Sequence, residues 1–372
     1  MPNAVPTTLD VGASLLIACT RARLDPVAAS RVRNLAGAVR DWPGVLDLAR
    51  RHGLLPLLHT HLNAVAADVV PEAARETLRE DFAANAAKNL GLAVELLAII
   101  ELLDFHGIRA LPYKGPPFAQ CVYGSLAARQ MKDVDILVRP TDANRAVSLL
   151  ATRGYSAVTS ILPGARGLGL EYQCALTRPS DETIIELHWS VVPRAMAPPV
   201  GLDDLWPSRL HTAILGRPLP TPSHEDMLVM LCIHGSKHQW ARLEWICCVA
   251  ELLRSKPLDW FRVAARADQW RAIRMLSTGL LLACDLLDAP VPEPQLAVAR
   301  GDAHATALAA SVLERLFVDD DPAVERRALR AFQLAAQEGL RDKARYIWFR
   351  PLIDGARRGA RFADWLRDAA ER

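Results

Sequence analysis

Residues 111–138, LPYKGPPFAQCVYGSLAARQMKDVDILV, form the segment around which the rest of the chain is arranged. It predicts a short strand that ends at Lys114-Gly115, a helical turn, and a second strand over Val134–Val138. Side chains two apart in a strand point to the same face, so Asp133 and Asp135 place two carboxylates side by side. Mg²⁺ is usually held by one or two carboxylates together with substrate phosphates. The stretch therefore predicts a metal site, although it does not name a substrate.

A second acidic strand is predicted downstream. Residues 183–189, TIIELHW, form a short apolar run that predicts a buried strand. In this strand Glu186 and His188 share one face, while Ile185 and Leu187 share the other. The third carboxylate, together with the first pair, could hold two metal ions that bridge an attacking oxygen and the phosphates of a nucleotide.

The same acidic residues also have a structural interpretation. Asp133 could cap its strand, Asp135 could pair with Arg129 or Lys132, and Glu186 could be a satisfied polar group of the core. An Asp-x-Asp pair alone is common, and the acidic position on the second strand favours the metal site.

Lys114-Gly115 stands at the end of the first strand. Glycine there lets the backbone approach a phosphate closely, and a neighbouring lysine can act as a point charge on that phosphate. The alternative is an ordinary turn before Pro116-Pro117.

His234 and His238 are four residues apart on a predicted helix, the spacing that brings two imidazoles together. The residues between them are Gly-Ser-Lys, without the glutamate of an HExxH metalloprotease. This favours two histidines that line a helix packed on the catalytic domain. Trp240 is interpreted as a core or interface aromatic, and Cys247-Cys248 as buried packing.

The composition narrows the class of protein. The chain has 372 residues, 51% of them hydrophobic, a net charge of +2, and seven cysteines without a CxxC pair. Such a chain can form two or three domains with reduced, mostly buried thiols. It has no run that reads as a membrane span or a secretory signal, so the expected location is the cytoplasm. The near-neutral charge disfavours a nucleic-acid-binding protein.

Helical and strand periodicity alternate along the chain and predict three parts. Residues 1–106 predict a helical region that ends in a long helix, with Pro71 at its start and Gly107 just past its end. Residues 107–220 predict a small α/β core with a helix capped by Thr141, a loop over 163–169, and a proline-rich linker after residue 192 with a hairpin near Gly216. Residues 221–372 predict a C-terminal helical domain. Its expected helices are Met227–Gln239, whose cap is Ser223 in a box with Asp226, then Leu243–Arg254, Trp260–Ala267, Arg271–Leu287, Ala303–Phe317 and Ala323–Gly339.

The ordered motifs resemble one family. They are Lys114-Gly115, Tyr123 and Arg129 before DVDILV (133–138), Gly154-Tyr155, ELHW (186–189) and HGSKHQWARLEW (234–245). Over about residues 40 to 350 the chain resembles the uncharacterised bacterial nucleotidyltransferase family of the DNA polymerase beta-like superfamily. Two positions depart from the wider pattern: the superfamily usually has Gly-Ser where this chain has Lys114-Gly115, and Cys248 stands where relatives tend to have an aspartate.

The resemblance implies an α+β, mainly helical protein whose small mixed β-sheet core is flanked by N- and C-terminal helical regions. It also implies transfer of a nucleoside monophosphate from an NTP with Mg²⁺. Asp133 and Asp135 match the metal ligands of the superfamily, and Glu186 matches the third carboxylate. Family members often accompany peptide-modifying enzymes in natural-product gene clusters, lasso peptides among them.

The leading hypothesis is therefore a two-metal nucleotidyltransferase that acts on a small-molecule or peptide acceptor. In it Lys114, Gly115 and Arg129 contact the NTP phosphates, with Lys132 and His188 as secondary contacts. Glu186 would also serve as general base.

The acceptor is expected between the sheet and the C-terminal helices, near His234, His238 and Trp240. The alternatives are a non-catalytic nucleotide-binding or regulatory partner protein and a toxin-like transferase acting on RNA.

Overall fold

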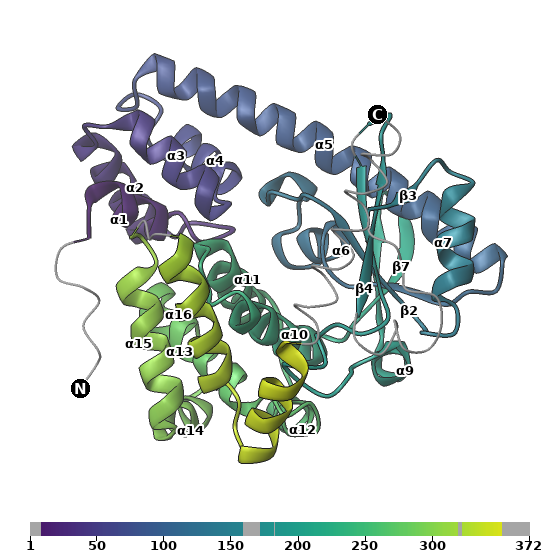
Figure 1. Ribbon diagram of the computed structural model, residues 1–372. Coiled ribbons are helices and arrows are strands. Elements are labelled where there is room, and N and C mark those ends of the chain that lie inside the picture. The colour runs from purple at the N-terminus through teal and green to yellow at the C-terminus, as the bar shows by residue number, and fades with distance from the viewer. Residues whose placement is uncertain (1–8, 159–171, 182, 319–321, 352–372) are drawn as a thin grey trace.

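The computed structural model describes residues 9–158, 172–181, 183–318 and 322–351. The loop expected over 163–169 lies outside these residues. The helices from both ends of the chain lie together at the left of Figure 1, and a small sheet lies at the right. This arrangement confirms the predicted α+β, mainly helical class.

The sheet is mixed and has five described strands in the order β1-β2-β5-β4-β3. The strands are β1 (Ala110–Pro112), β2 (Val134–Val138), β3 (Ser156–Ala157), β4 (Gln173–Arg178) and β5 (Thr183–His188). β2 and β5 are parallel and the other neighbours are antiparallel. The parallel register sets Asp135 opposite Glu186 and Leu137 opposite His188. The two acidic strands predicted from the sequence are thus direct neighbours.

The N-terminal region consists of helices, as predicted. They are α1 (Val11–Ala18), α2 (Pro26–Ala38), α3 (Trp42–His52), α4 (Leu55–Val65) and α5 (Glu72–Phe105). Pro71 and Gly107 flank α5, and Gly107 has a left-handed φ of 70°. The second half of α5 buries Leu96 and Ile99 in the same core as Ile136 of the sheet. This long helix therefore connects the N-terminal helices to the sheet (Figure 1).

Short helical elements connect the strands of the sheet. The turn between β1 and β2 contains α6 (Pro116–Phe118), a π-helix η1 (Ala119–Tyr123) and a 3₁₀ helix η2 (Leu126–Ala128). α7 (Ala143–Ala151) follows β2. The prediction that Thr141 caps α7 is wrong, because Asp142 occupies the cap position and its side chain makes no capping hydrogen bond.

The proline-rich segment after residue 192 is more ordered than a linker. It forms α9 (Leu202–Leu205), a 3₁₀ helix η3 (Trp206–Ser208) and a hairpin of β6 (Leu210–Ile214) and β7 (Arg217–Thr221). Leu215 and Gly216 both have positive φ, the geometry of a tight hairpin turn. Because Ile214 and Leu219 are buried in the core of the sheet, the hairpin prediction is confirmed and the linker prediction is wrong.

The C-terminal part is again helical. It comprises α10 (His224–Lys237), α11 (Leu243–Ser255), α12 (Trp260–Gln269), α13 (Ile273–Leu287), α14 (Glu293–Gly301), α15 (Ala303–Arg315) and α16 (Pro322–Ala335), and residues 340–351 are also helical. The sequence did not predict α14. Ser223 caps α10 as expected, but Asp226 does not complete the box, since its carboxylate binds Ser208 and Arg266 instead.

One hydrophobic core joins the N-terminal and C-terminal helices. The division at residues 106 and 220 stays a prediction. All seven cysteines are free, and five of them are buried, as expected.

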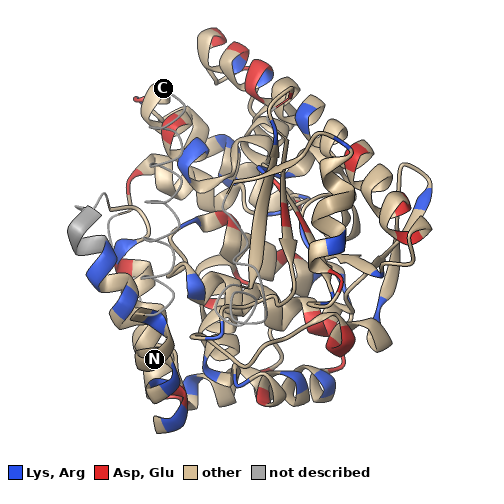
Figure 2. Ribbon diagram, turned by 45° about the vertical axis from the view of Figure 1, so that its right-hand side comes forward, with Lys and Arg blue, Asp and Glu red and all other residues tan. Residues whose placement is uncertain are grey.

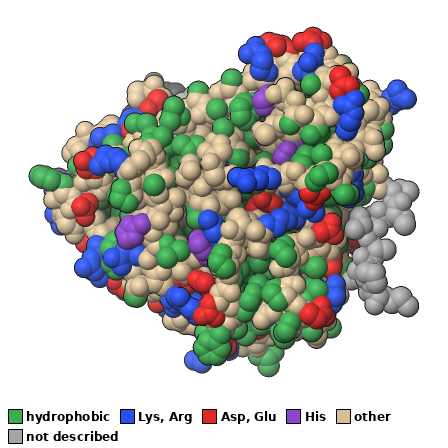
Figure 3. All heavy atoms as spheres, turned by 180° about the vertical axis from the view of Figure 1, so that it is seen from behind, with side chains coloured by type: hydrophobic (Ala, Val, Ile, Leu, Met, Phe, Trp, Pro, Cys, Tyr) green, Lys and Arg blue, Asp and Glu red, His purple; other side chains and the backbone are tan. Residues whose placement is uncertain are grey.

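Charges of both signs alternate along the helices (Figure 2) and are interspersed with hydrophobic side chains on the face shown in Figure 3. None of the described helices is long and apolar enough to cross a bilayer.

Candidate active site

A cavity of about 330 Å³ opens between the sheet, the segment before β2 and the end of α10. Ten of the eleven predicted site residues line it: Lys114, Gly115, Arg129, Lys132, Asp133, Asp135, Glu186, His188, His234 and His238. The remaining one, Trp240, lines a different cavity. Residues separated by more than 120 positions are therefore assembled in one place.

The centre of the cavity is a cluster of Asp135, Glu186 and His188. His188 Nε2 lies 3.0 Å from Asp135 Oδ1 and 3.4 Å from Glu186 Oε2. One ligand atom from each of the three side chains lies within 4.8 Å of the others, close enough to hold one cation. Asp133 stands just before β2 and borders this cluster without belonging to it. The tightest group is thus two carboxylates and an imidazole, where the sequence predicted three carboxylates.

His188 is buried against the carboxylates, and its assignment as a secondary phosphate contact stays a prediction. Its side chain is 2% exposed and turned to the two carboxylates. The ring also packs edge-on against Tyr113. The structure therefore makes His188 a partner of the carboxylates.

Lys114 connects the cluster to α10. Its Nζ lies 3.5 Å from Asp135 Oδ1 and 3.2 Å from His234 Nδ1. Gly115 follows with φ 60° and ψ −134°, a backbone conformation that favours glycine. Gly115 thus turns the chain sharply just after Lys114, whose side chain points into the cavity.

The pKa values of the three carboxyl groups in the cavity shift in different directions. Burial, followed by repulsion from Asp135 and Glu186, raises the pKa of Asp133 to about 6. Burial alone would also raise the pKa of Asp135, but Lys114 and His188 hold it well below its ordinary value. The pKa of Glu186 is lowered in spite of its burial, mainly by His188. The cationic neighbours thus favour the ionised forms of Asp135 and Glu186, while burial disfavours that of Asp133.

Arg129 is partly buried, whereas Lys132 is exposed. The Arg129 guanidinium packs 5.1 Å from the ring centroid of Phe118, and Asn85 and Asn89 donate to its backbone oxygen. Lys132 is exposed at the edge of the cavity. Neither forms the ion pair with Asp135 that the structural interpretation of the sequence required.

Several buried polar atoms in the lining have no hydrogen-bond partner within the described residues. They are Tyr113 Oη, Arg129 Nε, Gln130 Oε1, Gln173 Oε1, His188 Nδ1 and Glu244 Oε2. Buried polar groups are normally paired, so such a concentration in one cavity is typical of a binding site for a polar ligand.

Sequence reasoning missed other members of the lining. Lys237 Nζ donates to Tyr172 Oη at 2.6 Å, and Arg242 forms an ion pair with Glu244 at 3.1 Å, beside Trp245. Four of these residues belong to the motif HGSKHQWARLEW. That motif is the sequence signal for these residues, although its histidine spacing alone does not indicate them.

His234 and His238 hold no metal-binding geometry with a third ligand within the described part of the chain. Their rings are 4.8 Å apart. Burial, with smaller effects from nearby lysines, lowers the pKa of His234 well below its ordinary value and that of His238 to about 3. Both imidazoles are therefore neutral at physiological pH, and His234 can accept a hydrogen bond from Lys114.

Trp240 is a core residue with no exposed surface. Its indole lies in a slot between Gly235 and Gly279, where a Cβ would come within 2.5 Å and 3.0 Å of the ring. Trp240 is thus a core aromatic, as expected, while its expected place near the acceptor stays a prediction.

The chain belongs to the uncharacterised nucleotidyltransferase family, whose model matches residues 38–288, and this membership identifies the class of enzyme. This confirms the family that the motifs indicated and the class of enzyme. No curated protein matches the chain.

Solved structures are similar at low identity. The antibiotic-resistance factor ANT(2'')-Ia in solution has 14% identity and a TM-score of 0.34 over 50% of this chain and 92% of that chain. The lincomycin-bound lincosamide antibiotic adenylyltransferase LnuA has 15% identity and a TM-score of 0.27 over 36% and 82%. An antigenic nucleotidyltransferase-like protein from Paracoccidioides brasiliensis has 16% identity and a TM-score of 0.34 over 56% and 91%.

Proposed function

We propose that the protein transfers a nucleoside monophosphate from an NTP, with Mg²⁺, to a hydroxyl or phosphate group of a small molecule or peptide. The observation that carries this proposal is the convergence of Asp135, Glu186 and His188 beside Lys114 in one cavity. A peptide-derived natural product of the lasso type is a candidate acceptor within this class.

The side chains present fit a divalent cation. Asp135 and Glu186 are register partners on the adjacent strands β2 and β5. They offer the carboxylate oxygens that Mg²⁺ prefers. Asp133, with its raised pKa, would gain from a positive charge nearby. The metal would supply charge stabilisation at the phosphate oxygens and would orient the NTP. The imidazole of His188 is also compatible with Mn²⁺, so both ions belong in the assay.

The cationic side chains of the cavity are placed to bind the triphosphate. Lys114 lies against the cluster, Arg129 lines the cavity from the segment before β2, and Lys132 stands at its edge. Positive charges held in advance around the phosphates stabilise the charge that develops during an in-line displacement. We assign the phosphate contacts to these three residues.

Glu186 is proposed to take the proton of the attacking hydroxyl. Its side chain is 27% exposed, the most accessible of the three groups in the cluster. Because His188 lowers its pKa, Glu186 is ionised at neutral pH and can accept a proton. His234 positions Lys114 by accepting its hydrogen bond. His238 and Trp245 border the part of the cavity that faces the acceptor.

The test is transfer of label from each α-³²P NTP in the presence of Mg²⁺ or Mn²⁺ and a fractionated cell extract. Wild type is compared with Asp135→Asn and Glu186→Gln, and with Asp268→Asn on α12 as a matched control at an exposed site. We expect metal-dependent transfer by wild type and the control, and a loss of at least about 100-fold in the two site variants.

Binding of NTP is measured in parallel by calorimetry with and without metal. Absence of both metal-dependent NTP binding and label transfer in wild type would refute the enzyme. Binding without transfer to any fraction would support a regulatory nucleotide-binding protein. Transfer of label to RNA would show that the acceptor is a nucleic acid and not a small molecule or peptide.

A further inference from the structure

The imidazole of His188 points into the carboxylate cluster from a buried position. Its Nε2 lies 3.0 Å from Asp135 Oδ1 and 3.4 Å from Glu186 Oε2, and the side chain is 2% exposed. The rings of Tyr113 and Tyr172 pack against the imidazole, with centroids 5.2 Å and 5.9 Å from its own. This packing holds the plane of the imidazole, so Nε2 stays directed at the two carboxylates.

The other ring nitrogen of His188 is unsatisfied. His188 Nδ1 is buried and has no hydrogen-bond partner within the described residues. In a neutral ring that carries its proton on Nε2, toward the carboxylates, Nδ1 can only accept a hydrogen bond. A buried acceptor without a donor is unfavourable, so the arrangement without a ligand leaves this nitrogen at a cost in free energy.

Gln173 on β4 carries a second buried acceptor without a donor. The antiparallel register pairs Gln173 with His188, so both side chains lie on the face of the sheet that lines the cavity. Gln173 Oε1, like His188 Nδ1, has no partner in the part of the chain that the structure describes. Two acceptors cannot bond to each other, and therefore both stay unpaired.

A cation bound at His188 Nε2 would pair both atoms at once. A ring that coordinates a cation through Nε2 carries its proton on Nδ1, which then becomes a donor. Directly opposite residues of neighbouring strands have Cβ atoms about 4.5 to 5.5 Å apart, so a rotation of the Gln173 amide brings Oε1 within reach of Nδ1. The resulting hydrogen bond fixes the tautomer that leaves Nε2 available to a metal ion.

The donor set of the cluster distinguishes between kinds of divalent ion. Asp135 and Glu186 supply two negative charges, and Lys114 places one positive charge 3.5 Å from Asp135 Oδ1. Mg²⁺ prefers oxygen ligands, whereas the first-row transition ions also accept imidazole nitrogen. Two carboxylates with one imidazole therefore favour a transition ion over Mg²⁺.

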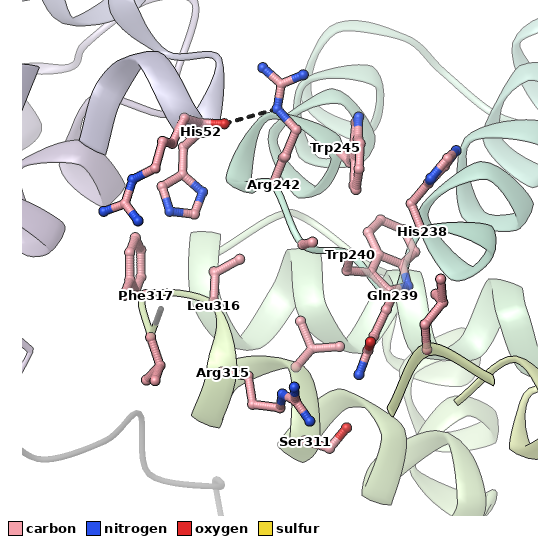
Figure 4. Close-up of a pocket in the computed structure, with 15 residues that line it drawn as sticks. His52, His238, Gln239, Trp240, Arg242, Trp245, Ser311, Arg315, Leu316 and Phe317 are labelled. Carbon is pink, nitrogen blue, oxygen red and sulfur yellow. Dashed lines mark hydrogen bonds between the residues drawn. The ribbon is translucent and has the colours of Figure 1, made fainter. Parts of the chain in front are cut away.

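The adjoining cavity, of about 500 Å³, offers no comparable site. It lies between the end of α3, the connection between α10 and α11, and the end of α15 (Figure 4), and shares His238, Arg242 and Trp245 with the first cavity. The described residues that line it include no aspartate or glutamate. A site of carboxylates and imidazole thus belongs to the first cavity.

We propose that Asp135, Glu186 and His188 bind a divalent first-row transition ion in preference to Mg²⁺, and that Gln173 positions His188 by accepting a hydrogen bond from Nδ1–H. The part of this ion in nucleotidyl transfer rests on the proposed function. Binding of the ion requires only these four side chains, so it is measured without NTP or acceptor.

The first test uses Mn²⁺ and the full-length wild-type protein after treatment with EDTA. Mn²⁺ is the weakest binder of the first-row series, which makes it a stringent probe. Titration followed by electron paramagnetic resonance, with Mg²⁺ as competitor, should show that Mn²⁺ binds at least about tenfold more tightly. Electron spin echo modulation of the bound Mn²⁺ should show coupling to an imidazole nitrogen. Equal affinities of the two ions, or absence of nitrogen coupling, would overturn the proposal without the use of any variant.

A histidine variant identifies the nitrogen. His188→Gln exchanges the imidazole for an amide, so it should abolish the imidazole coupling and reduce the preference for Mn²⁺ by about tenfold or more. His211→Gln, at an exposed position on β6, is the matched control and should behave as wild type does. Imidazole coupling that persists in His188→Gln, or that is lost equally in the control, would refute the assignment of the ligand.

The positioning by Gln173 is tested by the ratio of the two affinities. Gln173→Leu removes the acceptor and should weaken Mn²⁺ binding by about 10-fold to 100-fold, with little change for Mg²⁺. Gln173→Glu keeps an acceptor oxygen at the same reach and should retain Mn²⁺ binding. Gln269→Leu, exposed on α12, is the matched control. An equal loss for both ions in Gln173→Leu, or no loss for either, would show that Gln173 does not position His188.

Label transfer separates this inference from the proposed function. Mn²⁺ coordinated by an imidazole in a protein that binds no NTP and transfers no label would refute the proposed function and support the metal site. Label transfer that Mg²⁺ and Mn²⁺ support equally, in both wild type and His188→Gln, would support the proposed function and overturn the metal site.

Discussion

Replacement of Asp133 by asparagine should stabilise the metal-free protein and abolish its stabilisation by Mg²⁺. Asp133 has its pKa raised from 3.8 to about 6 by burial and by Asp135 and Glu186. One pKa unit corresponds to about 1.4 kcal/mol, so the ionised group costs the folded protein roughly 1 to 3 kcal/mol at pH 7. Asparagine has nearly the same shape and cannot ionise. The free energy of unfolding in EDTA should therefore rise by an amount in this range.

The pH dependence gives the sign of the effect. The folded protein binds a proton at Asp133 near pH 6, whereas the unfolded chain does so only near its ordinary value. Metal-free wild type thus gains stability from this group as the pH falls from about 6 to about 4, and the variant does not. The advantage of Asp133→Asn should be largest above pH 6 and should disappear near pH 4.

The assay has two parts. The first is urea unfolding in EDTA between pH 4 and 8. The second is thermal unfolding at pH 7.5 with and without about 5 mM Mg²⁺, a concentration suited to weak metal sites. Wild type should be stabilised by Mg²⁺ and Asp133→Asn should not. Asp268→Asn, at an exposed site, should follow wild type in both measurements. A metal-free variant less stable than wild type at pH 7.5 would show that Asp133 is held by favourable contacts, and the reasoning from like charges would be refuted.

Two further predictions concern packing and histidine. Gly235→Ala places a Cβ 2.5 Å from the ring of Trp240, so it should lower the free energy of unfolding, measured by urea denaturation, by about 1 to 3 kcal/mol. The control is Gly91→Ala, in a helix with open space around it, which should be neutral or stabilising. Equal effects of the two variants would contradict the packing argument. His234 and His238 have lowered pKa values, so below about pH 6.5 the unfolded chain binds protons that the folded protein does not bind. As the pH falls, each histidine should reduce the free energy of unfolding by up to about 1.4 kcal/mol per pH unit. His238→Gln should therefore flatten the dependence of Tm on pH between about 6.5 and about 5.

The sequence was most informative where chemistry and local periodicity coincide. Val134–Val138 is a strand with the predicted bounds, and Glu186 and His188 share a face of β5 as the alternation required. These predictions depend on residues within one strand, where the period of two determines the orientation of each side chain. They do not depend on the path of the intervening chain.

The sequence was least informative about contacts across long distances. Asp135 pairs with His188 rather than with Arg129 or Lys132. This pairing follows from the parallel register of β2 with β5. That register is set by packing over about 50 intervening residues and leaves no local pattern. The buried slot for Trp240 likewise needs Gly279, which only the tertiary fold brings close.

The N-terminal helices are part of the site although none of their residues contacts the carboxylate cluster. Gly53 ends α3 with φ 73°, and a Cβ at this position would collide with Glu244. His52 accepts the hydrogen bond of Leu243 N–H at the start of α11. Because Glu244 lines the first cavity and its neighbour Arg242 lines both, the end of α3 determines where the wall between the two cavities lies. The sheet identified from the sequence thus supplies the carboxylates and the imidazole of the cluster, while the helices before it shape the wall between the two cavities.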